Sequence, residues 1–376
     1  MNIILLTRSN PHDINTWSGT LWHVYAKLKE RHNIRVMGTE ILGQLAFFSK
    51  DNYQFKLFTP VERYLTKISK LLSERINNLE NYDLVFFGDL YFIPYEITIP
   101  YVVFSDMTFE QVRNHYKIAK TTNINTCIDI ERSLLNYAFK IIYPSEWIKK
   151  KAMEFYDLNP NKIDVVEFGA NIMTPANYSI ELNMDICRLV FIGKDWERKG
   201  GVKMIDIYKI LKNDDFPCTL TIIGSDKHEI DSDDCNLMIY NNLDKTKPSD
   251  MEEFQKILST SHFLVLPTKF DAFGIVFCEA SAYAIPSITA NVGGIGQVVI
   301  NGKNGYLLPA DATANDYADK IKTVFNDRDG YIKLRKSSRH EFETRLNWDV
   351  WGEKINQILE DTVANWKLQN NKTINI

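Results

Sequence analysis

Short runs of β-branched and aromatic residues recur along the chain, and longer amphipathic segments separate many of them. Near-continuous apolar runs are typical of parallel strands buried on both faces, and the segments between them supply the covering helices. The runs form two series, and each series predicts one doubly wound α/β unit. The first comprises Ile3–Thr7, Ile34–Met37, Leu84–Phe87, Tyr101–Phe104, Ile141–Tyr143 and Ile163–Val166, and the second Leu189–Ile192, Leu220–Ile223, Leu237–Tyr240, Phe263–Leu266, Ser287–Thr289 and Tyr306–Leu308.

The length of the chain suits two such units, because 376 residues exceed the roughly 250–300 at which one core usually stops growing. Residues 172–179 are polar, contain a proline and lack periodicity, so they indicate a connection between domains. After Asn347, a candidate N-cap, apolar residues fall on one helical face. We predict an N-terminal domain of residues 1–172 that also receives a crossover helix from 347–376, and a C-terminal domain of residues 173–346.

Composition argues against several classes of function. A net charge of −4 gives no bulk attraction to nucleic acid. The five cysteines form no Cys-x-x-Cys pair and the histidines lack metal-ligand spacing, so we expect no metal site and a reducing compartment. Residues 2–6 are too short an apolar run for a signal peptide, and no later run approaches the roughly 20 residues of a membrane span. We therefore expect a soluble, cytoplasmic protein.

Two loops have the composition of anion sites. The turn at residues 17–20 precedes a helix, and Gly19 would let a phosphate approach the backbone; the alternative is a simple tight turn capped by Ser18 or Thr20. The segment at residues 191–201 also leads from a strand into a helix. Its three cations could surround a diphosphate, although a charged, solvated loop would have the same composition: Lys194, Arg198 and Lys199. No dinucleotide-binding glycine motif follows the first strand.

A third segment, residues 270–280, carries two acids in apolar surroundings, Asp271 and Glu279. An unpaired carboxylate is costly in such a place, so each acid needs a partner. That partner can be a protein cation, a backbone N–H group or the hydroxyl groups of a ligand.

In combination, these motifs resemble the donor site of retaining glycosyltransferases of family 4, which have the two-domain GT-B fold. The resemblance covers most of residues 185–310 and rests on an ordered series: Gly193-Lys194, Lys199-Gly200, Asp271 to Glu279, Pro286, and residues 293–309. It implies two facing Rossmann-like domains around a central cleft. It also implies a nucleotide diphosphate sugar as donor, with UDP or GDP expected as the nucleotide, and no bound cofactor.

The resemblance assigns a role to each matching residue. Glu279 would accept hydrogen bonds from the ribose hydroxyls, and Asp271 would meet the hydroxyls of the transferred sugar. Backbone N–H groups of residues 273–275 (Phe273, Gly274 and Ile275) would point at the sugar and phosphates, with a helix start reinforcing them. Lys199 and Lys194 would neutralise the leaving diphosphate, and Arg198 would share this role.

This chain departs from the family pattern at several positions. Asp271 is one methylene shorter than the usual Glu, Ala284 stands where glycine is usual, and Gln297 replaces an acid. Asp106 follows a strand at the place where many members have a histidine facing the sugar. Its carboxylate would orient a sugar hydroxyl or support positive charge at the anomeric carbon, or it would cap the helix that contains Phe109.

Two other features are interpreted as structural. Asp231-Ser-Asp233 resembles a metal-binding Asp-x-Asp, but a solvated acidic loop is favoured. An apolar stripe flanked by cations could touch an anionic membrane at its inner face, but a core-facing helix is favoured: Leu65, Ile68, Leu72, Ile76 and Leu79.

The sequence therefore favours a metal-independent, retaining glycosyltransferase acting on a glycan, lipid-linked or protein acceptor, with the first domain supplying most of the acceptor surface. Two alternatives remain open. One is a sugar-nucleotide epimerase of similar fold, which would need Asp106 and Asp271 as acid–base residues. The other is a scaffold that binds nucleotide sugars without chemistry.

Overall fold

The computed structural model describes residues 1–38, 61–88, 97–116, 124–172, 178–225 and 234–374. Contacts divide the chain into two compact units. Unit 1 contains Met1–Val166 and Gly352–Ile376, and unit 2 contains Glu167–Trp351. The domain limits expected from the sequence, at residues 172 and 346, lie near these division points.

Unit 1 is built on a six-stranded parallel sheet with strand order β2-β1-β3-β4-β5-β6. All residues of β3 and β4 are buried, as expected of central strands covered on both faces. The strands are β1 (Asn2–Leu6), β2 (Asn33–Met37), β3 (Leu84–Phe87), β4 (Tyr101–Phe104), β5 (Lys140–Tyr143) and β6 (Ile163–Val165).

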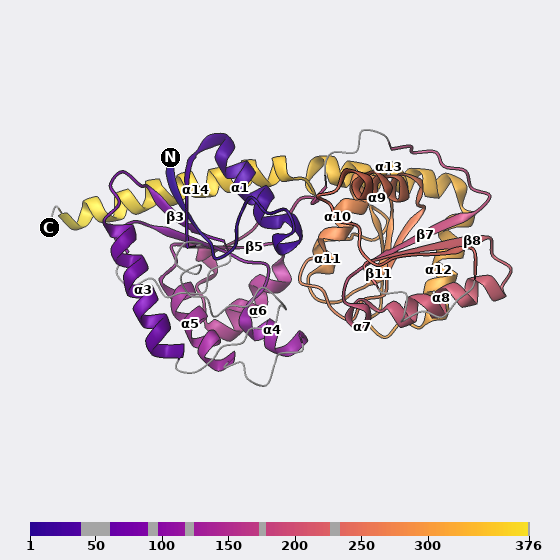
Figure 1. Cartoon of the computed structure of the whole chain (residues 1–376), viewed down its shortest axis with the longest axis horizontal. Helices are drawn as coiled ribbons and strands as arrows, with labels where there is room; N and C mark the ends of the chain where they lie inside the picture. Colours follow the sequence, from indigo (N-terminus) through magenta and orange to yellow (C-terminus); the bar gives the residue numbers. More distant parts are fainter. Residues whose placement is uncertain (39–60, 89–96, 117–123, 173–177, 226–233, 375–376) are drawn as a thin grey trace. The chain divides into compact units, whose positions relative to one another are not determined.

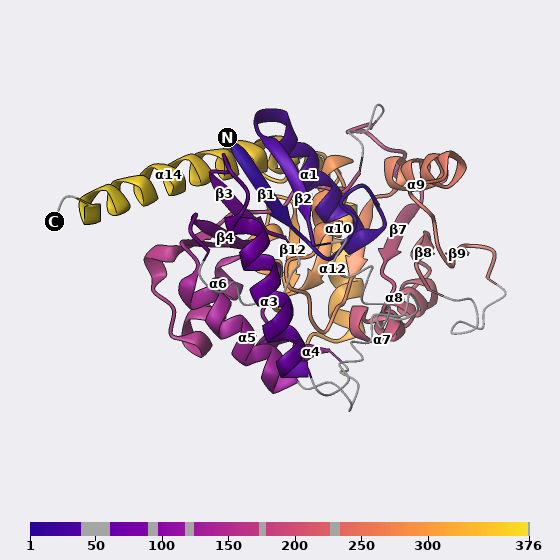
Figure 2. The same cartoon turned by 60° about the vertical axis from the view of Figure 1, so that its left-hand side comes forward.

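Helices cover both faces of this sheet. Helix α1 (Thr20–Arg31) and the later part of α14 (Trp348–Ile374) lie on one face, and α3 (Val61–Asn77), α5 (Ile124–Tyr137) and α6 (Glu146–Tyr156) lie on the other (Figures 1 and 2). Shorter helices connect them: η1 (Thr16–Gly19), α4 (Phe109–His115) and η2 (Pro160–Lys162). Among the described helices, none has the length and apolarity needed to cross a membrane.

The long helix α14 begins where the sequence predicts. The Asn347 side chain caps it, because Oδ1 accepts a hydrogen bond from the Val350 N–H at 2.9 Å. Further along, Asn356 Oδ1 lies 2.9 Å from His32 Nε2, next to the end of α1. The expected crossover from the second domain to the first is therefore confirmed.

Unit 2 repeats the architecture with a second six-stranded parallel sheet, in the order β12-β11-β10-β7-β8-β9. Its strands are β7 (Cys187–Ile192), β8 (Cys218–Ile223), β9 (Leu237–Tyr240), β10 (Phe263–Leu266), β11 (Ser287–Ala290) and β12 (Gly305–Leu308). Helices α8 (Gly201–Asn213) and α12 (Ala314–Asn326) lie on one face, with α9 (Pro248–Thr260), α10 (Ile275–Ala282) and α13 (Arg328–Thr344) on the other (Figure 1). Two single-turn helices, α7 (Trp196–Lys199) and α11 (Ile295–Val298), follow β7 and β11.

Both predicted series of strands are thus confirmed, with small differences at the strand ends. The apolar stripe begins in α3 and ends two residues beyond it, at Leu79, and within the helix Leu72 and Ile76 are each 2% exposed. This part of the stripe faces the core, as the sequence favoured. The Asp-x-Asp at residues 231–233 lies outside the described residues.

One buried acid supports the loop that carries Asp106. Glu131 on α5 is 3% exposed and accepts hydrogen bonds from the Phe109 N–H, at 2.7 Å, and from the Tyr156 hydroxyl. Burial raises the pKa of Glu131 to about 8, and these two hydrogen bonds oppose the shift only in part. The start of α4 is therefore hydrogen-bonded to a carboxyl group that is easier to protonate in the folded state than in the unfolded chain.

This raised pKa makes the stability of unit 1 depend on pH. The contribution of Glu131 is fully present below its unfolded pKa, near 4.5, and is lost as pH rises through about 8. A Glu131→Gln variant keeps an oxygen acceptor but does not ionise. Urea unfolding at pH 5.5 and pH 8.5 should therefore show the wild-type protein losing stability relative to this variant at the higher pH. Glu146→Gln, at an exposed acid, serves as the control; equal pH dependence in all three proteins would contradict the account.

Candidate functional site

The predicted donor residues gather at one edge of the unit 2 sheet. They follow β7 and β10, and the segments after β9 and β11 contact them at the edge where the carboxyl ends of the parallel strands meet. The sequence placed the segments after β7, β10 and β11 in one site. The segment after β9, residues 241–247, was not predicted to contribute.

The segment after β7 is shaped by glycines. Gly200 has φ 79°, and a Cβ there would lie 2.0 Å from the Pro267 carbonyl oxygen. At Gly193 a Cβ would lie 2.8 Å from Lys199 Cγ, so this glycine leaves room for the lysine side chain. The single turn α7 places Lys199 beside the loop that follows β10. Only glycine allows the backbone at positions 193 and 200 to lie this close to Lys199 and Pro267.

The three cations of this segment have different surroundings. Arg198 is held by Asp195, 3.0 Å from its Nε, and donates from Nη1 to the Phe270 carbonyl oxygen at 3.0 Å. Lys199 donates to Asp271 Oδ2, and both side chains are 13% exposed. Lys194 is exposed, and none of the described carboxylates forms an ion pair with it. Hydrogen bonds from Thr246 lower the pKa of Asp244, and the charge of Lys194 adds to this effect.

Asp271 is fixed by the loop after β11. Its carbonyl oxygen accepts a hydrogen bond from the Gly294 N–H at 3.0 Å, and a Cβ on Gly293, which has φ 56°, would approach that oxygen to 2.1 Å. The sequence assigned Lys199 to the diphosphate and Asp271 to the sugar. The structure shows that these two residues also form an ion pair with each other.

The N-terminus of α10 lies between the two acids. Gly274 precedes the helix with φ 91°, and its Cβ position is crowded by the Phe277 ring. No described residue accepts a hydrogen bond from the N–H groups of Phe273, Gly274 or Ile275. A helix start with such N–H groups carries partial positive charge and suits an anion. The place of the sugar and phosphates at these N–H groups stays a prediction.

Glu279 faces the same edge from the second turn of α10. It is only 5% exposed, and its Oε1 accepts a hydrogen bond from Lys245 Nζ at 2.6 Å. Among the described residues, none donates a hydrogen bond to Oε2. Lys245 also donates to the Asn171 carbonyl oxygen at 3.1 Å, and its ammonium group lies 5.3 Å from the centre of the Phe254 ring. The sequence analysis did not identify Lys245. The signal that could have pointed to it is that a buried acid such as Glu279 needs a partner, for which a cation is suitable.

A second predicted group lies in unit 1. Trp17, Ser18 and Gly19 all have left-handed φ angles, of 49°, 55° and 95°. Trp17 Nε1 donates to Asp106 Oδ2 at 3.1 Å, although 89 residues separate them. Neither Ser18 nor Thr20 caps α1, because the N-cap is Gly19 and no side chain bonds there.

The alternative role for Asp106, as the cap of α4, is wrong. Thr108 is the N-cap and forms a capping box with Gln111. Asp106 instead joins the strained turn at Trp17 to the end of β4. Strain of this kind is typical of functional sites, where surrounding structure holds it in place.

Two departures from the family pattern have local explanations. Ala284 adopts φ 58°, a left-handed angle that favours glycine, so the glycine expected there would fit without strain. Gln297 donates from Nε2 to Glu167 Oε1 at 3.0 Å, and Arg345 contacts the same oxygen at 2.7 Å. Because Glu167 already supplies the negative charge, an acid at position 297 would be repelled.

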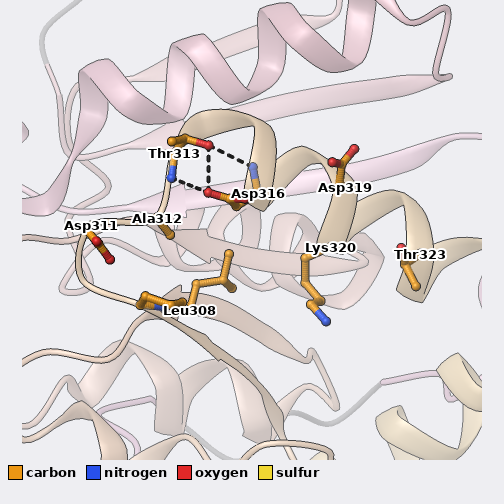
Figure 3. Close-up of a pocket in the computed structure, with 9 residues that line it drawn as sticks. Leu308, Asp311, Ala312, Thr313, Asp316, Asp319, Lys320 and Thr323 are labelled. Carbon is orange, nitrogen blue, oxygen red and sulfur yellow. Dashed lines mark hydrogen bonds between the residues drawn. The ribbon is translucent and has the colours of Figure 1, made fainter.

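A surface pocket of about 550 Å³ lies at the start of α12, and none of the predicted donor residues lines it. Figure 3 shows Thr313 and Asp316 joined by the hydrogen bonds of a capping box, with Lys320 and Asp319 one turn further along. The lining residues are Leu308, Pro309, Asp311, Ala312, Thr313, Asp316, Asp319, Lys320 and Thr323. Among the described residues, no group of His, Cys, Asp and Glu side chains is arranged to hold a metal ion.

Residues 180–341 match the family model "Glycosyl transferases group 1". This part of the chain is similar to group 1 glycosyltransferases. The match contains the segments after β7, β9, β10 and β11 that form the site. The resemblance to glycosyltransferases stated from the sequence is therefore confirmed at the level of the group 1 family.

Curated proteins similar to the chain have glycosyltransferase names. An uncharacterized glycosyltransferase of Methanocaldococcus jannaschii is 28% identical over 230 residues, covering 59% of this chain and 59% of that protein. The capsular polysaccharide biosynthesis glycosyltransferase CapM of Staphylococcus aureus is 26% identical over 251 residues, covering 62% of this chain and 65% of CapM. The matched regions thus span about six tenths of the length of these relatives.

Solved structures extend the likeness to both units. A glycosyltransferase from Rickettsia africae has a TM-score of 0.69 at 16% identity, over 97% of this chain and 99% of that one. Anabaena HepE, solved in complex with UDP and glucose, has a TM-score of 0.66 at 13% identity, over 96% of this chain and all (100%) of that one. The chain therefore has the predicted GT-B fold.

The crowding at Gly200 leads to a stability prediction. A Gly200→Ala variant should lose about 2–5 kcal/mol, because it combines a left-handed φ with a steric clash against Pro267. Gly302 is a matched control: its φ is 74°, but a Cβ there would meet nothing within 4 Å. Gly302→Ala should therefore lose only the strain of about 1–2 kcal/mol. Urea unfolding measures both losses. Equal losses for the two variants would show that the clash with Pro267 adds nothing to the cost of the Gly200→Ala substitution.

Proposed function

We propose that the protein is a retaining, metal-independent glycosyltransferase that moves a sugar from a nucleotide diphosphate sugar to a glycan, lipid-linked or protein acceptor. The observation that carries the proposal is the burial of Glu279 together with its incomplete set of hydrogen-bond partners. This acid is almost fully buried, one of its oxygens is paired with Lys245, and the other receives no hydrogen bond from the described residues. A buried acceptor of this kind suits the hydroxyl groups of a ribose.

The neighbouring groups suit the rest of a nucleotide sugar. The diphosphate would lie against the N–H groups of Phe273–Ile275 and the ammonium group of Lys199. Lys194 would supply further charge, since it has no carboxylate partner among the described residues. A cation about 4 Å from a phosphate charge gains roughly 4 kcal/mol before desolvation, at an effective dielectric constant near 20. These cations would thus stabilise the departing diphosphate in place of a metal ion.

In this proposal the Lys199–Asp271 ion pair has a part in the reaction. Asp271 neutralises Lys199 in the structure. When the diphosphate arrives, Lys199 would turn toward it, which would leave the Asp271 carboxylate to accept hydrogen bonds from the transferred sugar. The departing phosphate would then accept the proton of the acceptor hydroxyl on the same face of the sugar, and the anomeric configuration would be retained. Asp106 would support positive charge at the anomeric carbon.

A thermal-shift screen tests donor binding without knowledge of the acceptor. UDP-, GDP-, ADP- and dTDP-sugars are added in the presence of EDTA, and one nucleotide is expected to raise the melting temperature. Glu279→Gln should weaken that binding about 10- to 100-fold, because the hydrogen bond to a charged group is lost. The matched control Glu252→Gln alters an exposed acid on α9 and should bind as the wild type does. A normal shift in Glu279→Gln would contradict the assignment.

Turnover with the selected donor tests the chemistry. Lys199→Met should lower kcat by about 10²–10³, as for other groups that stabilise developing charge, while Lys209→Met on the exposed face of α8 should leave it unchanged. NMR of the product should show the anomeric configuration of the donor. An inverted product would exclude retention, and a requirement for added divalent metal would exclude metal independence. Epimerised nucleotide sugar formed without an acceptor would favour the epimerase.

A further inference from the structure

The buried acid of the donor site is paired with a lysine that no sequence motif includes. Lys245 lies in the segment between β9 and α9, and its ammonium group meets Glu279 Oε1 at 2.6 Å. The Asn171 carbonyl oxygen, at 3.1 Å, accepts a second hydrogen bond from it. The Phe254 ring packs against the same group. Lys245 is therefore held in place by three different segments of unit 2.

This pair has hydrogen-bonding capacity left over. An ammonium group carries three N–H donors, and among the described residues only Glu279 and Asn171 accept from Lys245. In the same way, no described residue donates to Glu279 Oε2. The pair thus offers one free donor next to one free acceptor. Because Lys245 Nζ lies 2.6 Å from Glu279 Oε1, a ligand that reaches the acid also lies close to the lysine.

We propose that Lys245 is a ribose-binding residue of the donor site and that it acts together with Glu279. Each hydroxyl of a vicinal diol can both donate and accept a hydrogen bond. One ribose hydroxyl would donate to Glu279 Oε2, and the Lys245 ammonium group would donate to a ribose oxygen. The inference rests on the proposed function, because it names a further contact within the same nucleotide site.

The surroundings argue for a binding role in addition to charge balance. A lysine needed only to neutralise Glu279 would be satisfied by the carboxylate and water. Lys245 is instead anchored on the Asn171 carbonyl oxygen, and Asn171 is 1% exposed and itself fixed by Trp348 Nε1 at 3.0 Å. Such preorganisation lowers the cost of ordering the side chain when a ligand binds.

The test compares ribose with its deoxy forms. Calorimetry measures the affinity of UDP and GDP, and then of the 2′-deoxy and 3′-deoxy forms of whichever binds more tightly. Wild-type protein should prefer the intact ribose about tenfold or more, since a missing hydroxyl leaves the charged pair without its partner. Lys245→Met should weaken binding of the intact nucleotide about tenfold and should bring its affinity close to that of a deoxy form.

Controls separate contact with the ribose from support of Glu279. Lys247→Met removes an exposed lysine from the same segment and should bind as the wild type does. Glu279→Gln and the double variant Lys245→Met/Glu279→Gln contain no unpaired buried carboxylate, so the comparison holds even if Lys245→Met alone fails to fold. If Lys245 contacts the ribose, adding Lys245→Met to Glu279→Gln should weaken binding of the intact nucleotide further. If Lys245 only orients Glu279, adding Lys245→Met should leave the affinity of the Glu279→Gln variant unchanged.

The outcomes distinguish the inference from the proposed function. If the wild type binds a nucleotide, and Glu279→Gln weakens that binding while loss of Lys245 leaves the preference for intact ribose unchanged, the role of Lys245 is overturned and the donor site stands. If none of the four nucleotides of the thermal-shift screen binds the wild type at all, the proposed donor site is overturned, and the role of Lys245 with it.

Discussion

The cost of burying an ionised carboxylate governs the arrangement of unit 2. Glu279 lies on α10 and is 5% exposed, so an unpaired charge there would be strongly disfavoured. Lys245 compensates this charge, and Asn171 and Phe254 fix Lys245 in turn. The segments after β9 and β10 are thereby brought together at the edge of the sheet. The same pairing leaves one carboxylate oxygen for a ligand, so the requirement for stability also creates the site.

A second constraint is the close approach of backbone segments around Asp271 and Lys199. Gly200 packs against the Pro267 carbonyl group, and Gly293 and Gly294 pack against that of Asp271. These contacts hold two oppositely charged side chains close to the start of α10. Groups fixed in advance around a developing charge are the main means by which enzymes stabilise transition states. The fold thus supplies rigidity where the proposed reaction needs it.

The sequence revealed the strands more readily than the pairing of site residues. Runs such as Leu84–Phe87 are apolar throughout because both faces of a parallel strand are covered, and this local property can be recognised without a structure. Lys245 lies in a polar segment that carries no motif, and only the fold brings it to Glu279. The Trp17–Asp106 hydrogen bond likewise joins residues that are distant in sequence. Contacts of this kind depend on tertiary structure, which residue patterns do not encode.

The central claim is that the ribose of a nucleoside diphosphate binds at Glu279, and a crystal structure of the chain grown with UDP or GDP tests it most directly. The account predicts a ribose hydroxyl oxygen about 2.6–3.2 Å from Glu279 Oε2. The diphosphate should lie between Lys199 and the N–H groups at the start of α10. A nucleotide bound in the pocket beside α12, or with its ribose turned away from Glu279, would contradict the account.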